Sequence, residues 1–290
     1  MKNKLEQFID IFYEKELSVL PGNLAYSFTL AIIPILSLIF YVLTSFHLPV
    51  DIFWNFLSET LPTGINELLQ PIFFTNEITF NSFLTISLSM FVTISGCNAI
   101  IISCNTIYKF KNSSLLKRII KSIVLTGILI LLLAFIIIVP LLGKSIINLI
   151  GTFTDFISNN QTIINLIYGI ARWPLSLIIM FIAIKLVYTI APDEKIPSKY
   201  VNKGSIFTTV SWLIVTGIFS YYINHIARYD LLYGNLANLV MLLFWFYILA
   251  YIFVIGLFLN KEKSDKGIEK TNAIKLEEIR KKVKEEKNNK

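Results

Sequence analysis

Long apolar segments dominate the pattern of this chain. The longest, Leu236–Leu259, has 24 residues without a charge, and Asn238 is its only strongly polar side chain. A helix of that length, at about 1.5 Å per residue, covers the roughly 30 Å hydrocarbon core of a bilayer. A soluble protein has little use for such a segment, so the pattern predicts a transmembrane helix.

Five further apolar segments predict an all-α, polytopic membrane bundle of six transmembrane helices. The expected spans are 24–46, 82–105, 119–139, 170–190, 205–224 and 236–259. Together they would form a membrane domain over residues 23–260. Residues 261–290 carry a thin apolar stripe on a charged background, which is typical of a cytoplasmic tail that is either a short solvated helix or disordered.

Three other segments have the periodicity of amphipathic helices. Residues 3–20 place apolar side chains along one side and charges along the other, so an N-terminal helix in the membrane interface is expected within residues 1–22. The pair Pro21-Gly22 is expected to end it. Residues 50–74 and 144–168, both in outer connections, would lie on the outer leaflet or cap a cavity.

Basic residues gather in alternate connections. Twelve Lys or Arg side chains lie in or beside the N-terminal segment and the connections between spans two and three and between spans four and five, and the remaining connections hold three. Because basic connections stay on the cytoplasmic side, both termini are expected in the cytoplasm. An even number of spans requires the same arrangement.

The composition of the chain limits which classes of binding partner are expected. Charged residues make up 16% of the 290, against about 25% in soluble domains. Residues 1–260 hold 15 basic and 12 acidic side chains, and the last 30 hold 11 and 7. The aromatic residues lie in apolar runs and not on a folded basic face, so no nucleic-acid partner is expected. The expected partners are the lipid bilayer and anionic inner-leaflet lipids, drawn by the basic loops and tail; homo-oligomerisation stays open.

Span two is the most polar of the six. It repeats small polar side chains every four residues, at Thr85, Ser89, Thr93 and Cys97, with Gly96 and Asn98 alongside. One interpretation is close helix packing, since small residues let backbones approach and hydroxyls bond across helices. The other is a face that lines a polar cavity. Asn98 and Asn105 are the better cavity candidates, because their amides are harder to satisfy by packing alone.

Two prolines interrupt the apolar pattern. Pro34 removes a backbone donor in the middle of span one and is expected to kink it, either as a static bend or as a hinge beside a substrate path. Arg172-Trp173-Pro174 is interpreted as the interfacial start of span four, with a snorkelling Arg and a helix-starting Pro.

Catalytic motifs are absent from the sequence, which contains no HExxH, GxSxG, GxxxxGK[ST] or GxGxxG. Its two histidines, His47 and His225, fall at the outer ends of different spans and are weak evidence for a metal site. We therefore expect no enzymatic activity, no metal and no cofactor.

Four motifs, in order, resemble the YihY/BrkB family of bacterial inner-membrane proteins. They are LAYSFTLAIIP (Leu24–Pro34), CNTIYK (Cys104–Lys109), APDEKIP with Gly204 (Ala191–Gly204) and the last span with its YG start, Trp and closing Gly (Tyr233–Asn260). The resemblance covers most of residues 5–260 and implies six spans with both ends inside. With the polar positions of span two, the motifs give the candidate cavity or motif residues Tyr26, Pro34, Asn98, Asn105, Tyr108, Pro192, Gly204, Tyr233, Gly234, Trp245 and Gly256.

The resemblance implies little about activity. Family members commonly carry an acid just after the Gly-x pair of the last span, where this chain has Phe258. The family has carried a ribonuclease label, but this sequence contains no set of residues typical of a nuclease. A hydrolytic metal site needs several Asp or His ligands. A transporter or permease-like protein for a small solute or lipid is the preferred hypothesis. A non-catalytic membrane-organising or interaction protein is the alternative, and an enzyme comes third.

Overall fold

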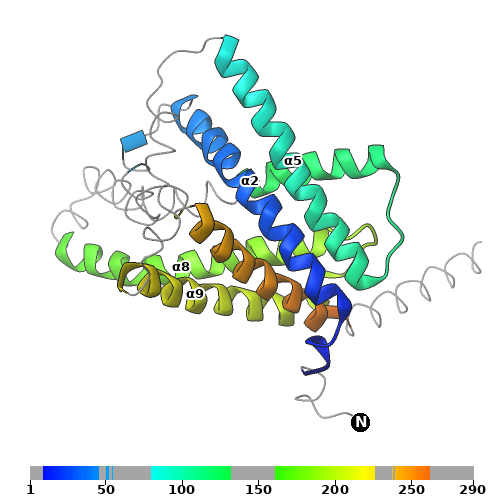
Figure 1. Cartoon of the computed structure of the whole chain (residues 1–290). Coiled ribbons are helices and arrows are strands. Elements are labelled where there is room, and N and C mark those ends of the chain that lie inside the picture. Colours follow the sequence, from blue (N-terminus) through cyan, green and yellow to red (C-terminus); the bar gives the residue numbers. More distant parts are fainter. Residues whose placement is uncertain are drawn as a thin grey trace, which may run out of the picture.

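The computed structural model describes residues 9–45, 50, 51, 54, 80–131, 161–225, 237 and 239–261. Within these ranges every regular element is a helix, which confirms the all-α prediction for this part of the chain. The long helices are α2 (Lys15–Ser45), α5 (Phe80–Tyr108), a helix over residues 115–131, α8 (Gln161–Ile190), α9 (Asn202–His225) and the Leu239–Lys261 helix. A 3-10 turn, η1 (Ser198–Tyr200), precedes α9 (Figure 1).

Three helices in the described part are long and apolar enough to cross a bilayer. They are Met90–Tyr108 within α5, Asn202–Ile223 within α9, and Leu239–Lys261, which is the most apolar of the three. A shorter apolar helix covers Leu177–Ile190. Spans five and six were expected within three residues of these helices, and span two within three residues of the whole of α5, because an unbroken apolar run fixes both the type and the length of such an element.

Most connections in the described part meet at one end of the bundle. In Figure 1 the end of α5, the start of the 115–131 helix, the end of α8, the start of α9 and the end of the Leu239–Lys261 helix all lie towards the right of the view. The first turns of α2 lie near this end too. The connections found here are 109–114 and 191–201, each of which carries two lysines.

The predicted helix break at Pro21-Gly22 is wrong. Helix α2 runs through both residues, and the chain turns earlier, at Phe12 and Tyr13. A proline inside a helix loses one backbone hydrogen bond, whereas a break in apolar surroundings leaves several polar backbone groups without partners. Continuing the helix is therefore the less costly arrangement. The turn leaves Ile9, Phe12 and Tyr13 exposed, as an interfacial segment requires.

Span four also begins earlier than expected. Helix α8 starts at Gln161, so Pro174 lies inside it and is not a helix start. The same balance of backbone hydrogen bonds explains this error. The expected amphipathic segment 144–168 lies outside the described residues up to 160, and its last residues belong to α8.

The small-residue face of α5 packs against other helices. Thr93, Gly96 and Cys97 are buried. A Cβ placed on Gly96 would lie 3.3 Å from Ala31 Cβ, so α2 approaches α5 closely here. Thr126 of the 115–131 helix donates a hydrogen bond to Cys97 Sγ at 3.1 Å. These contacts favour the packing interpretation of this face; the side chains of Thr85 and Ser89 lie outside what the structure describes.

Candidate functional site

A carboxylate, Asp193, connects distant parts of the chain at the end of the bundle where the basic connections meet. Its Oδ2 accepts hydrogen bonds from Asn105 Nδ2 at 2.7 Å and from the Ser113 backbone N–H at 2.9 Å. Its Oδ1 accepts from Lys121 Nζ at 3.1 Å. These donors come from α5, from the 109–114 loop and from the 115–131 helix, whereas Asp193 follows α8.

Asn105 is the buried partner of Asp193 in this contact. The residue is fully inaccessible to solvent, and its amide is satisfied at both ends. Asn105 Oδ1 accepts from the Asp193 backbone N–H at 2.8 Å, and Nδ2 donates to Asn112 Oδ1 at 2.9 Å as well as to Asp193. We call the set Asn105, Asn112, Ser113, Lys121, Pro192 and Asp193 the Asp193 clasp. Complete pairing is what permits a buried amide in apolar surroundings.

Lys121 brings the charge that balances the carboxylate. Its Nζ also donates to the Pro192 backbone carbonyl. Partial burial by itself would raise the pKa of the Asp193 carboxyl. The hydrogen bonds from Ser113, Lys121 and Asn105, with the Lys121 charge, together hold that pKa below its usual range. Asp193 is therefore an anion at neutral pH, and its side chain is only 11% exposed.

A second contact joins α8, α9 and the Leu239–Lys261 helix. Gly204 and Gly256 face each other so closely that a Cβ on Gly204 would overlap the Gly256 carbonyl oxygen. A Cβ on Gly256 would overlap the hydroxyls of Tyr188 and Thr208. A side chain on Gly204 would therefore collide with backbone, whereas a methyl group on Gly256 would have to displace the two hydroxyls.

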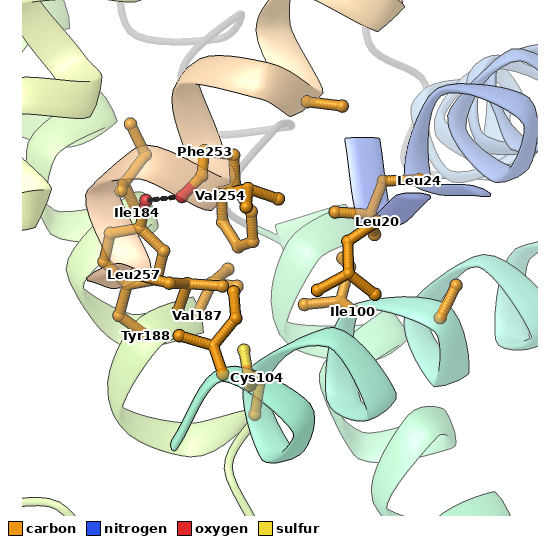
Figure 2. Close-up of a cluster of buried hydrophobic side chains, with 14 of the residues drawn as sticks. Leu20, Leu24, Ile100, Cys104, Ile184, Val187, Tyr188, Phe253, Val254 and Leu257 are labelled. Carbon is orange, nitrogen blue, oxygen red and sulfur yellow. Dashed lines mark hydrogen bonds between the residues drawn. The ribbon is translucent and has the colours of Figure 1, made fainter. Parts of the chain in front are cut away.

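Hydrogen bonds surround this glycine contact. Tyr188 Oη donates to the Phe253 carbonyl at 2.8 Å (Figure 2) and lies 2.7 Å from Thr208 Oγ1. The Gly204 N–H donates to Asn260 Oδ1 at 2.7 Å, so a side chain of the last helix satisfies a backbone donor in the first turn of α9. We call Tyr188, Gly204, Thr208, Gly256 and Asn260 the glycine crossing.

The two contacts share one core. Cys104, the residue before Asn105, lies with Val187, Tyr188 and Leu257 in the cluster of Figure 2. Tyr188 is in the last turn of α8, and Asp193 follows shortly after that helix ends. The end of α8 is thus held by the clasp on one side and by the glycine crossing on the other.

Several candidate residues from the sequence meet in these two places. Asn105 and Pro192 belong to the Asp193 clasp, and Gly204 and Gly256 belong to the glycine crossing. Tyr108 is buried at the end of α5, with its ring centroid 5.6 Å from that of Phe110.

Other candidates lie apart from these contacts. Tyr26 is 62% exposed on α2, Asn98 is half-buried, and Trp245 is half-buried with its ring centroid 5.0 Å from that of Phe246. Pro34 lies within α2, but its side chain is outside what the structure describes, so the expected kink stays a prediction. Tyr233 and Gly234 lie outside the described residues.

Sequence reasoning missed the central residue, Asp193, and its partners Asn112 and Lys121. Asp193 was visible only as one of two acids in a loop that also carries two lysines, and it lies 88 residues from Asn105. One signal was available in the sequence. Asn105 was a predicted buried amide in need of a partner, and Asp193 was a carboxylate expected on the same side of the membrane. Tyr188, Thr208 and Asn260 were missed for the same reason.

Metal chemistry has no visible basis in the described part of the chain. Within it, no group of three or more His, Cys, Asp or Glu side chains lies close enough to hold a metal ion. His47 is outside the described residues, and so is the side chain of His225. The two contacts above hold helices together.

Comparison with known proteins gives consistent matches. The family model described as "Virulence factor BrkB" matches residues 8–277. YfkH of Bacillus subtilis, which is named a ribonuclease-like protein, is 28% identical over 81% of this chain and 86% of its own length. The UPF0761 membrane protein MS0032 of Mannheimia succiniciproducens is 23% identical over 94% of this chain and 93% of its own. No solved structure matches.

The glycine crossing gives a direct packing prediction. Gly256→Ala should destabilise the protein by about 3 kcal/mol, because the new methyl group must displace the Tyr188 and Thr208 hydroxyls. Gly217→Ala on α9 is the control: nothing lies within 4 Å of its Cβ position, so its effect should stay within about 1 kcal/mol. Thermal unfolding in detergent measures both, and equal effects would contradict the close approach.

The clasp predicts an acid-dependent component of stability. Asp193→Asn should cost about 2 kcal/mol at neutral pH, because Lys121 loses its anion. Since the folded-state pKa of Asp193 is lowered, its contribution is present above the ordinary carboxyl pKa of about 4 and is lost as the pH falls through the lowered value.

The gap in melting temperature between wild type and Asp193→Asn should therefore be constant near neutral pH and should close below about pH 4. The adjacent exposed acid provides the control, because Glu194→Gln should lie within about 0.5 kcal/mol of wild type throughout. A gap that does not change with pH would mean that the Asp193 charge is not what stabilises the clasp.

Proposed function

Because this chain belongs to the BrkB virulence-factor family of membrane proteins, we propose that it spans the bacterial cytoplasmic membrane six times with both termini inside. The connections 109–114 and 191–201, which carry Lys109, Lys111, Lys195 and Lys199, meet at one end of the bundle, in line with the preference of Lys and Arg for the cytoplasmic side. On this assignment the Asp193 clasp faces the cytoplasm. The relatives named above are also bacterial.

Within that setting, a transporter or permease-like function for a small solute or lipid is the one that the geometry supports best. The observation that carries it is the Asp193 clasp, which ties α5 and the 115–131 helix to the loop after α8. The net contribution of a partly buried ion pair is smaller than the cost of removing one of its partners, because desolvation of both charges offsets much of their attraction. Such a contact suits a closure that is made and released, with the glycine crossing as the rigid part beside it.

A membrane-organising or interaction protein is the second candidate. The exposed apolar residues before α2 and the basic tail would then serve as docking elements, and the bundle would stay closed. Anionic inner-leaflet lipids are proposed partners under either function, through the basic loops and tail.

We further propose that the chain is not an enzyme, despite the ribonuclease-like name of its Bacillus subtilis relative. Purified protein should leave RNA intact. Hydrolysis of RNA that disappears in His47→Ala and His225→Ala would contradict this proposal.

The accessibility of Cys104 separates a releasable closure from a fixed one. Cys104 and Cys97 are free thiols, and Cys104, which precedes Asn105 in the chain, is fully buried. If the clasp is a closure, Asp193→Asn should speed labelling of Cys104 by an impermeant maleimide in inside-out membrane vesicles by about tenfold or more. The modified peptide is identified by mass spectrometry.

Glu194→Gln should label as slowly as wild type, and Cys104→Ser should remove the signal. If Asp193→Asn lowers the melting temperature while Cys104 stays protected, the bundle end does not open, and the membrane-organising function is favoured. If labelling of Cys104 does speed up, mass spectrometry of the small molecules and lipids that co-purify with the protein would identify the transported class.

A further inference from the structure

The segment 109–124, which follows α5, combines exposed cations with an exposed apolar stripe. From its first turn the 115–131 helix presents to the outside the side chains Leu115, Leu116, Ile119, Ile120, Ile123 and Val124. Leu115 and Leu116 are 68% and 75% exposed, whereas Ser122 and Leu125 on the other side are fully buried. One face of this helix thus packs on the bundle, and the opposite face is apolar and uncovered.

Cations stand at the start of this stripe. Lys109, Lys111 and Lys117 are all exposed, and none of the three makes an ion pair with any residue that the structure describes. Lys121, one turn further along, is already committed to Asp193. The surface therefore changes from positively charged to apolar within the first turn of the helix.

We propose that the 109–124 segment binds an anionic phospholipid of the adjacent leaflet, and that this lipid stabilises the closed Asp193 clasp. The headgroup phosphate would contact Lys111 and Lys117, while an acyl chain covers the stripe that begins at Leu115. The order of charge and then apolar surface matches the order of headgroup and then chain in a phospholipid. The inference rests on the proposed membrane orientation.

The proposed lipid site and the Asp193 clasp are connected through the polypeptide chain. Asn112 accepts a hydrogen bond from Asn105, and the Ser113 N–H donates one to Asp193. Both residues lie between Lys111 and the first helical residues. A lipid that restrains Lys111 on one side and Lys117 on the other restrains this short loop. Because lipid bound to the closed form stabilises it by mass action, anionic lipid should shift the clasp towards closure.

The test uses the full chain in neutral detergent, mixed with phosphatidylglycerol or with phosphatidylcholine. Phosphatidylglycerol should raise the melting temperature and slow hydrogen exchange of the Ser113 amide by about fivefold or more, whereas phosphatidylcholine should do neither. In the double variant Lys111→Gln with Lys117→Gln, both effects of phosphatidylglycerol should disappear. The melting temperature of that variant in phosphatidylcholine should match wild type, because both lysines are exposed.

The matched control is Lys195→Gln with Lys199→Gln, which removes the same charge from exposed positions in the neighbouring 191–201 connection. It should retain both effects. Equal loss in the two double variants would overturn the proposal in favour of a general attraction of positive protein for anionic micelles. Equal responses to the two lipids would overturn it as well. Neither readout requires transport, so failure here is distinct from failure of the Cys104 labelling test.

Discussion

The Asp193 carboxylate is the contact on which the arrangement of this bundle end depends. It accepts hydrogen bonds from a buried amide, from a backbone N–H and from a lysine, which come from three successive parts of the chain. Apolar helices in lipid have no hydrophobic force to choose one partner over another, so polar contacts and close packing decide how they assemble. The clasp supplies the polar contact and fixes where the loop after α8 lies.

The glycine crossing supplies the close packing. Gly204 and Gly256 let α9 and the Leu239–Lys261 helix approach until backbone meets backbone, and Asn260 and Tyr188 then satisfy the polar groups that this approach buries. The clasp can be broken by loss of one charge, whereas the crossing depends on shape and has no such switch. This difference makes the clasp the natural place for motion and the crossing the natural place for rigidity.

The apolar pattern was sufficient to predict the helical class and the bounds of α5, α9 and the last helix, because bilayer thickness sets a length that the sequence must match. It failed at Pro21 and Pro174, where rules for helix ends in water do not apply among apolar neighbours. Asn105 was found because a buried amide in a span is costly. Asp193 was not, because its role depends on a partner 88 residues away that no local pattern encodes.

A double-mutant cycle between Asn105 and Asp193 tests the central claim most directly. Asn105→Ala, Asp193→Ala and the double variant are compared by their free energies of unfolding in mixed detergent micelles. The clasp predicts a coupling energy of about 2 kcal/mol, because each single variant already removes the hydrogen bond from Asn105 Nδ2 to Asp193 Oδ2. Effects that add to within about 0.5 kcal/mol would show that the two side chains act independently and would contradict the account.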